Sequence, residues 1–176
     1  MEKEKWSEYT YFEDDPLTAH IIKCLRKITH EIGRHSKFIQ ENYHITLPQV
    51  ITLREIAQHG PISFSHLTKL IFLNNSTLTG IVDRLEKHEL VKRVRMSKDR
   101  RQIHLEITDK GKETLKTAPP PIDPKFITNL KQLPQEEINE LLLNLEKIIL
   151  LFNTGGEFTS YFDKEKIDKE KTVSSQ

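Results

Sequence analysis

The chain has 176 residues, of which 36% are hydrophobic and 30% charged, so it is long enough for one domain with a buried core and too apolar to be disordered. It has one cysteine, no apolar run of the roughly 18 residues that a membrane helix needs and no apolar leader, so we expect no internal disulfide, no Cys-based zinc finger, no membrane span and a cytoplasmic location. The net charge of +1 by itself argues against a nucleic-acid-binding domain, because such domains usually carry a clear positive excess.

The chain opens with an acidic, aromatic extension, residues 1–15, which holds six acidic residues against two lysines. Pro16 is typical of a helix start, and apolar residues then recur at helical spacing to about Tyr43, which predicts a long N-terminal helix within 16–45. Leu47-Pro48 predicts the start of a second helix, which Gly60-Pro61 ends. The residues expected to point inward from this second helix are Val50, Leu53, Ile56 and Ala57.

Two further helices are predicted close together. Ser63-Phe64-Ser65 indicates the start of a short helix, with Leu67, Leu70 and Ile71 on one face. Residues 74–76 break this helix and can cap the next one. In that next helix, Leu78, Ile81, Val82 and Leu85 have the spacing of a buried stripe. The opposite face carries Ser76, Thr77, Gly80, Arg84 and Lys87.

The apolar period then changes from 3.6 to 2, which indicates strands. Residues 91–96 and 103–107 alternate in polarity on either side of a polar turn at 97–102, and so predict a β-hairpin of two strands. Residues 92–101 contain six basic residues and one acid, a net charge of +5, whereas residues 1–15 carry −4. The small total charge therefore conceals a basic patch at the hairpin.

The C-terminal part of the chain is again helical. Residues 108–111 indicate a helix start, and the prolines at 119–121 interrupt the helical pattern because proline lacks an N–H donor. A last helix begins near Leu133-Pro134, carries a dense apolar stripe and ends at Gly155-Gly156. Residues 155–176 are rich in charged and polar residues and are expected to form a flexible tail.

This order of helices followed by a basic hairpin predicts a winged helix-turn-helix. A helix that enters the major groove buries one stripe on its own domain and presents small polar residues and basic ends to the DNA. An arginine at a hairpin tip can enter the minor groove, and Asp99 can orient it through a bidentate contact. The predicted DNA-binding residues are Ser76, Thr77, Thr79, Gly80, Arg84, Lys87, Arg95, Lys98, Asp99, Arg100, Arg101 and Gln102.

The stretch from Ile62 to Gly111 resembles the MarR family of bacterial transcriptional regulators. The residues that carry the resemblance are the helix 75–86, Leu90-Val91, the Asp-x-Arg wing signature at Asp99 and Arg101, and the sequence Ile107-Thr108-Asp109-Lys110-Gly111. The resemblance implies a homodimeric repressor of a pseudo-palindromic double-stranded DNA operator, with the recognition helix in the major groove and the wing in the minor groove. It also implies release by a ligand, oxidation or a metal, so a small-molecule effector of unknown identity is a further expected partner.

The expected fold is mainly α with a small β-hairpin wing, an α+β arrangement. The winged helix-turn-helix domain is predicted at 46–116, with the helix-turn-helix at about 63–88 and the wing at about 91–108. Residues 16–45 and 117–154 are expected to mediate dimerisation, because a domain this polar has too little apolar surface elsewhere to cover the last helix. The predicted dimer residues are Leu17, Ile21, Leu25, Phe126, Leu130, Ile138, Leu141, Leu142, Leu145, Ile148, Ile149 and Phe152.

Two regulatory chemistries are alternatives to a plain structural role for Cys24 and the histidines. Redox-sensing relatives surround a cysteine of the first helix with tyrosines, but no tyrosine lies near Cys24 in sequence, so we expect a buried, inert thiol. Zinc-sensing relatives need His-x-x-x-His after the wing, where this chain has Lys112 and Lys116, so no metal is expected. His30 and His35 can instead line a pocket at the dimer interface.

Catalytic motifs and phosphate-binding loops are missing from the sequence, so we predict no enzymatic activity and no cofactor. The main alternative to a DNA-binding regulator is a winged-helix module that binds protein without sequence-specific DNA binding. Its affinity should lack a strong dependence on salt. A second alternative, an enzyme with its site in a dimer cleft, requires converging titratable residues that the sequence does not show.

Overall fold

The computed structural model describes residues 15–95 and 103–152. These residues fall into two compact units, divided between Ile127 and Thr128, and each unit is described by itself.

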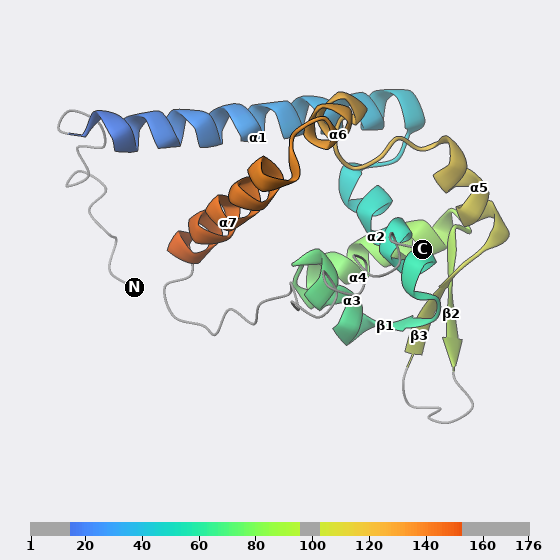
Figure 1. The fold of residues 1–176 in the computed structure, drawn as a ribbon. Coiled ribbons are helices and arrows are strands. Elements are labelled where there is room, and N and C mark those ends of the chain that lie inside the picture. The colour runs from blue at the N-terminus through green and yellow to red at the C-terminus, as the bar shows by residue number, and fades with distance from the viewer. Residues whose placement is uncertain (1–14, 96–102, 153–176) are drawn as a thin grey trace, which may run out of the picture. The chain divides into compact units, whose positions relative to one another are not determined.

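The first unit opens with the long helix α1 (Pro16–Tyr43), drawn in blue in Figure 1. The helix begins where predicted because the Asp15 carboxylate accepts hydrogen bonds from the backbone N–H groups of Leu17, at 3.0 Å, and Thr18, at 3.3 Å. It ends at His44, which adopts the left-handed conformation with φ 54°. Within α1 only His35 and Ile39 are buried, so most of its apolar residues lie on the surface of the single chain.

Four elements follow and form the helix-turn-helix. They are α2 (Leu47–His59), the short strand β1 (Ile62–Ser63), α3 (Phe64–Ile71) and α4 (Asn75–Lys87). The start of α3 is capped by the Ser63 hydroxyl and that of α4 by the Asn74 side chain, as the polar residues at these positions predict. The buried side chains of these helices form one apolar core, which includes Val50, Leu53, Ile56, Leu67, Leu78, Ile81, Val82 and Leu85.

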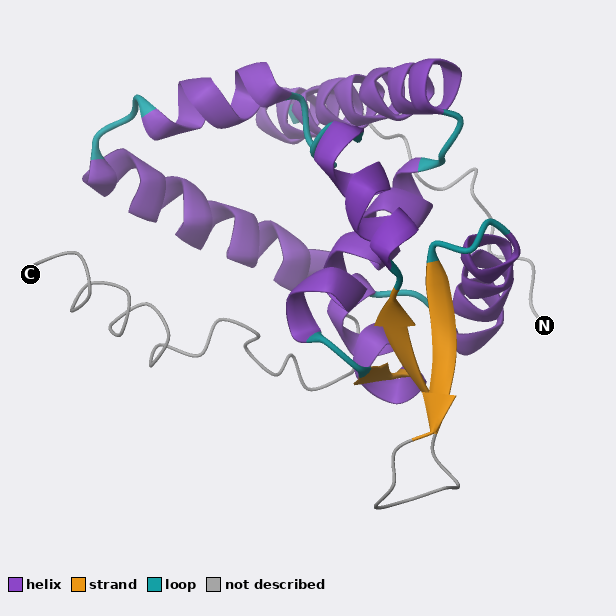
Figure 2. Ribbon diagram, turned by 90° about the vertical axis from the view of Figure 1, so that its right-hand side faces the viewer, coloured by secondary structure: helices purple, strands orange, loops and turns teal. Residues whose placement is uncertain are grey.

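A three-stranded antiparallel sheet completes this core. The predicted hairpin consists of β2 (Val91–Arg95) and β3 (Ile103–Ile107), and β1 pairs with the other edge of β3, giving the order β1-β3-β2 (Figure 2). The register places Ile62 opposite Leu105 and Val91 opposite Ile107. All four of these side chains are buried, so the hairpin is fixed to the helices by its apolar face.

The structure adds one strand to the predicted hairpin and shows that one predicted inward residue, Ala57, is wrong. The sheet has a third strand, because two residues of β1 pair with β3. Ala57 is exposed rather than inward, since the buried stripe of α2 runs through Val50, Leu53 and Ile56. Ile103, the first residue of β3, is exposed, whereas Leu105 and Ile107 on the same face are buried.

The chain then forms α5 (Asp109–Thr117), whose first turn is capped by the Thr108 hydroxyl. The prolines at 119–121 end this helix as predicted, and α6 (Pro124–Lys131) begins after them. Side chains of α1 and α2 bind the backbone carbonyl groups between α5 and α6. The Arg54 guanidinium donates to the carbonyl oxygens of Ala118, at 3.0 Å, and Pro119, at 3.3 Å, and His35 Nε2 donates to that of Pro120, at 2.9 Å.

The second unit contains the end of α6 and the helix α7 (Gln135–Phe152). Much of α7 is apolar and lies on the surface of the single chain. Leu151 is 82% exposed and Phe152 72% exposed. No helix among the described residues is long and apolar enough to span a membrane.

Candidate nucleic-acid interface

The exposed face of α4 begins at a well-formed helix start. The Asn74 side-chain oxygen accepts hydrogen bonds from the backbone N–H of Thr77 and from the Ser76 hydroxyl, both at 2.8 Å. The Thr79 hydroxyl donates to the backbone oxygen of Asn75 at 2.8 Å. Ser76, Thr77 and Thr79 are all exposed. The first turn of α4 therefore presents small hydroxyl side chains, and its positive dipole end favours a phosphate.

Gly80 lies on the same face and has no structural reason to be glycine. A Cβ built on it would meet nothing within 4 Å, and its backbone does not have a positive φ. Glycine inside a helix costs about 1 kcal/mol relative to alanine. The open space above Gly80 is therefore available to an external group that must approach the helix closely.

Three basic residues surround this face, and none of them has an acidic partner within residues 15–95 and 103–152. Arg84 and Lys87 lie in the last turns of α4 and Arg95 at the end of β2, and all three are exposed. Among the described residues, none of them makes an ion pair. Their positive charge is uncompensated, which favours a polyanion.

Arg93 on β2 has a different role from its basic neighbours. Its guanidinium bonds to Asp83 at 2.7 Å and also to Glu86, both on α4, and lies 5.8 Å from the centre of the Phe64 ring. Its side chain is only 31% exposed. Arg93 thus joins β2 of the wing to α4.

The charge of the hairpin is consequently smaller than its sequence suggests. Arg93 is compensated by two acids on α4, and Lys92 pairs with Glu106 across the sheet at 3.1 Å. Of the basic residues on β2, only Arg95 is uncompensated within the described part of the chain. Lys98, Asp99, Arg100, Arg101 and Gln102 lie outside the described residues, so their predicted contacts remain predictions.

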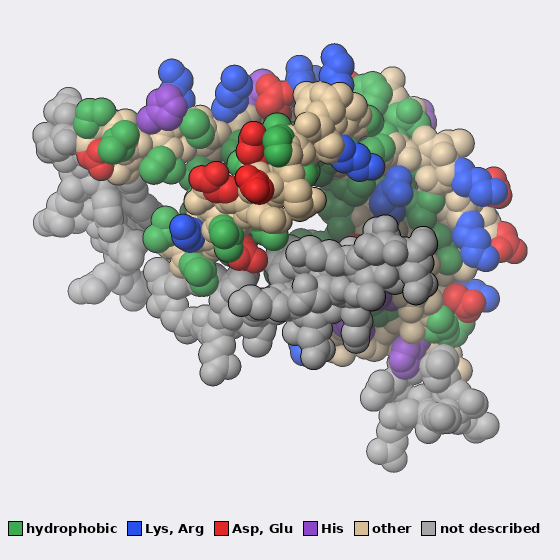
Figure 3. Space-filling model, viewed as in Figure 1, with side chains coloured by type: hydrophobic (Ala, Val, Ile, Leu, Met, Phe, Trp, Pro, Cys, Tyr) green, Lys and Arg blue, Asp and Glu red, His purple; other side chains and the backbone are tan. Residues whose placement is uncertain are grey.

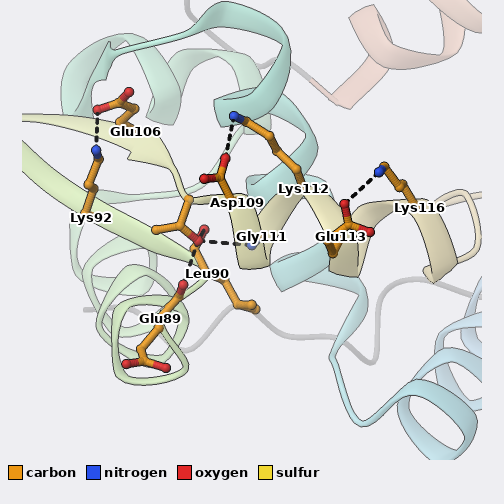
Figure 4. A network of polar contacts seen from close by, with 10 residues as sticks. Glu89, Leu90, Lys92, Glu106, Asp109, Gly111, Lys112, Glu113 and Lys116 are labelled. Carbon is orange, nitrogen blue, oxygen red and sulfur yellow. Dashed lines mark hydrogen bonds and ion pairs between the residues drawn. The ribbon is translucent and has the colours of Figure 1, made fainter.

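The wing is anchored at its base by the start of α5 (Figure 4). The Thr108 hydroxyl donates to the backbone oxygen of Glu89 at 2.6 Å, and the Thr108 N–H donates to that of Leu90 at 3.1 Å. The same hydroxyl accepts from the N–H of Gly111 at 3.0 Å. One side chain therefore caps α5 and fixes the turn between α4 and β2, which explains the Thr-x-x-Gly sequence after the second strand.

Ion pairs cover the outside of this anchor. Lys112 pairs with Asp109 at 2.9 Å and Lys110 with Glu89 at 3.0 Å, and Figure 3 shows acidic and basic side chains lying next to one another over α5. The hydrogen bond and charge of Lys112 lower the pKa of Asp109, and those of Lys110 lower the pKa of Glu89. Because its charges are paired, this side of the winged helix is a weak candidate for binding DNA.

The regulatory predictions for α1 have mixed outcomes. Cys24 is exposed in the chain, so the prediction of a buried thiol is wrong. It lies on the wall of a cavity, together with His35, whereas His30 does not line that cavity. Among the described residues, no group of three or more His, Cys, Asp or Glu side chains could hold a metal ion.

The predicted dimer residues are apolar side chains that the single chain covers incompletely. Leu17, Ile21, Phe126, Leu141, Leu145, Ile149 and Phe152 are exposed, and Leu25, Leu130, Ile138, Leu142 and Ile148 are half-buried. This exposure is consistent with a second copy of the chain covering these side chains. Their role in dimerisation stays a prediction.

A family model described as the MarR family matches residues 45–103, which run from just before α2 to the start of β3. The HTH-type transcriptional regulator YsmB of Bacillus subtilis, described as uncharacterized, is 33% identical over 97 residues, which is 55% of this chain and 66% of that protein. The HTH-type transcriptional regulator MgrA of Staphylococcus aureus is 27% identical over 142 residues, covering 80% of this chain and 95% of the relative.

A solved structure with a similar fold comes from the same family. The structure of a MarR family protein from Bacillus stearothermophilus matches with a TM-score of 0.58 and 26% sequence identity, over 80% of this chain and 99% of that one. The match extends beyond the winged helix, since the winged-helix elements alone make up a smaller share of the chain.

Proposed function

The chain belongs to the MarR family of winged helix-turn-helix transcriptional regulators, and we propose that it binds a pseudo-palindromic DNA operator as a homodimer. In each protomer α4 enters the major groove and the wing reaches the neighbouring minor groove. Repression is the expected outcome of binding, because a dimer seated on an operator blocks access to it.

The exposed face of α4 is the observation that supports this proposal most directly. It combines three hydroxyl residues at the helix start with Gly80, whose open surface allows close approach, and with the uncompensated Arg84. Hydroxyl groups and arginine are donors for phosphates and base edges, and a small residue lets a helix lie deep in the groove. If this face of α4 met only solvent, alanine would stabilise the helix more than the glycine at position 80 does.

The wing supplies the second contact. Arg93 fixes the hairpin to α4 through Asp83 and Glu86, so the two DNA-binding elements move as one body. Arg95 continues the hairpin toward the predicted contact residues Lys98 and Arg101. An arginine placed in a narrow minor groove benefits from its concentrated negative potential.

Dimerisation gives the operator its symmetry. A two-fold dimer places two recognition helices on related half-sites, so the DNA sequence repeats with inverted orientation. The incompletely covered apolar residues of α1, and separately those of α7, support such a partner, since exposed apolar side chains gathered on one helix mark an interface.

The test begins by selecting bound fragments from the genome of the source organism with the purified chain. Fluorescence anisotropy on the selected duplex then gives the affinity at several salt concentrations. We expect a steep fall of affinity with salt and weaker binding by about 1–3 kcal/mol for Arg84→Ala and for Arg101→Ala. The matched control is Lys116→Ala, since Lys116 on α5 already pairs with Glu113 at 2.6 Å and should leave the affinity unchanged.

Each contrary outcome has a specific meaning. Binding that does not depend on salt favours the protein-interaction module over the DNA-binding regulator. Equal loss in Arg84→Ala and Lys116→Ala would show that affinity follows net charge and not the face of α4. A monomeric protein in sedimentation at the concentrations used for binding would refute the homodimer.

A further inference from the structure

The segment between α5 and α6 passes beside α1 and is bound from two sides (Figure 1). The half-buried Arg54 of α2 donates to the carbonyl oxygens of Ala118, at 3.0 Å, and Pro119, at 3.3 Å. His35, a buried residue of α1, donates from Nε2 to the carbonyl oxygen of Pro120 at 2.9 Å. We call these three acceptor residues the bridge segment, because they connect α2 of the helix-turn-helix to α1.

Apart from this bridge, α1 is attached to the helix-turn-helix near its C-terminal end. Ile39 is its one side chain in the apolar core, and residues 16–34 contain no buried side chain. The helix then ends at His44 in the left-handed conformation. Hinges form at such element ends, where a few residues absorb a rotation. His35 lies about 13 Å along the helix from this end, so a bond at that position opposes rotation about the turn.

The bridge segment is stiff enough to transmit this constraint. Proline has a fixed φ, and prolines occupy positions 119–121. The buried Ala118 is tied to α5 by its N–H, which donates to the backbone oxygen of Thr114 at 2.9 Å. Within the described ranges the Arg54 guanidinium has no carboxylate partner, so the two carbonyls are what compensates its partial burial.

We propose that Arg54 and His35 act through the bridge segment to fix the angle between α1 and the helix-turn-helix. They thereby set the distance between the two recognition helices of the homodimer, which rests on the proposed function because α1 carries residues assigned to dimerisation. Both are positioning residues, since their donors are bound to backbone carbonyls and not directed at DNA.

A small change of this angle is enough to matter for an operator. Ile21, one of the predicted dimer residues, lies about 35 Å along α1 from His44. A rotation of about 10° at the turn would displace it by about 6 Å, close to two base-pair steps of about 3.4 Å. A dimer whose angle is fixed should therefore accept one half-site spacing and reject its neighbours.

The distance between the recognition helices can be measured without DNA. In a Cys24→Ser background, which has no cysteine, Lys87→Cys places one spin label at the exposed end of α4 in each protomer. Pulsed electron paramagnetic resonance then gives the separation of the two labels. We expect one narrow distribution. Arg54→Met, which keeps an apolar stem and removes the donors, should widen it at least about twofold, as release of a hinge requires.

Operator spacing tests the consequence for DNA binding. The duplex selected from the genome is compared with the same duplex carrying two base pairs inserted between its half-sites. The parent chain should bind the altered duplex at least about tenfold more weakly, and Arg54→Met less than about threefold more weakly. The ratio of two affinities measured on one preparation does not depend on the folded fraction, so instability alone cannot change it.

Two further variants separate positioning from charge. Arg54→Lys keeps a donor and should restore part of the spacing preference. Lys116→Met removes the same charge from α5, where Lys116 pairs with Glu113 and not with the bridge segment, and should behave like the parent chain.

A double variant tests whether the two attachments act in series. His35→Phe keeps a ring beside Phe38 and removes the donor to Pro120. Because either break releases α1, each single variant should weaken the spacing preference and the double variant should be no weaker than Arg54→Met alone. Independent effects of two distant side chains would add instead.

A spacing preference and a label distance that Arg54→Met leaves unchanged would overturn the inference and leave the proposed function standing. So would an equal loss of preference in Lys116→Met, or additive effects of His35→Phe and Arg54→Met. If the labelled protein gives no dipolar signal, or the parent chain binds the selected duplex no better than random DNA, the proposed function itself fails and the inference with it.

Discussion

Gly111→Ala is the most direct test of how the wing is attached to the rest of the fold. Gly111 is buried in the first turn of α5, against the turn that leads into β2. A Cβ at this position would overlap the carbonyl oxygen of Leu90 and lie only 2.7 Å from Cγ1 of Ile107. Carbon atoms in ordinary contact are about 3.5–4.0 Å apart. The obstructing atoms are backbone and a buried strand residue, so neither moves aside easily.

The size of the effect follows from two opposing contributions. Alanine is the better helix former by about 1 kcal/mol, which alone would stabilise the variant. Overpacking typically costs about 1–3 kcal/mol, and moving α5 away would also strain the hydrogen bonds of Thr108 to Leu90 and Glu89, each contributing about 1 kcal/mol. We expect the free energy of unfolding to fall by about 2 kcal/mol.

Urea unfolding followed by circular dichroism measures this difference. The midpoint should fall while the slope m stays constant, provided that both proteins are compared at one concentration. Gly33→Ala is the matched control, because a Cβ on Gly33 in α1 would meet nothing within 4 Å. That variant should gain about 0.5–1 kcal/mol. If Gly111→Ala is as stable as Gly33→Ala, the steric argument is wrong.

Three further outcomes are expected. Gly80→Ala should raise the free energy of unfolding by about 0.5–1 kcal/mol and yet weaken operator binding; a variant that is more stable and binds equally well would remove the case for close approach at α4. Arg93→Gln should lower stability by about 1 kcal/mol in the same urea assay, since it leaves Asp83 without its partner; unchanged stability with lost DNA binding would assign Arg93 to the DNA instead. Lys112→Met should raise the pKa of Asp109 toward its ordinary value in an NMR titration, because the bond from Lys112 is the main cause of the lowered pKa. The stabilisation from this carboxylate is present above its unfolded pKa and is lost as the pH falls through its lower folded pKa, so a variant without any change in that acid-side titration would contradict the assignment.

The sequence predicted the helices well because their ends are determined by local interactions. Pro16 and Leu47-Pro48 lie at the starts of α1 and α2, and the polar caps at Asn74 and Thr108 accept N–H bonds within three residues of themselves. The apolar stripes of α3 and α4 likewise become the core, since helical periodicity alone places them on one face. The exposed, small and polar side of α4 could therefore be found without coordinates.

Interactions between segments far apart in the chain could not be predicted from caps and periodicity. β1 is only two residues long and exists because β3, about forty residues later, offers it an edge. The charge counted along the hairpin includes only its own residues. Its net charge in the fold also depends on acids of α4 and β3, which lie beside Lys92 and Arg93 only after folding. A charge count along the chain cannot separate a cation that binds DNA from one that joins two elements.

The sequence by itself thus determined the order of the helices and the hairpin, the family resemblance and the polar face of α4 that we propose meets DNA, because caps, period and side-chain type act over a few residues. The tertiary structure decided which cations are compensated, why residue 111 must be glycine and where a cavity opens beside Cys24. Those properties depend on close approach between segments that are far apart in sequence, and such distances are determined by packing of the whole unit.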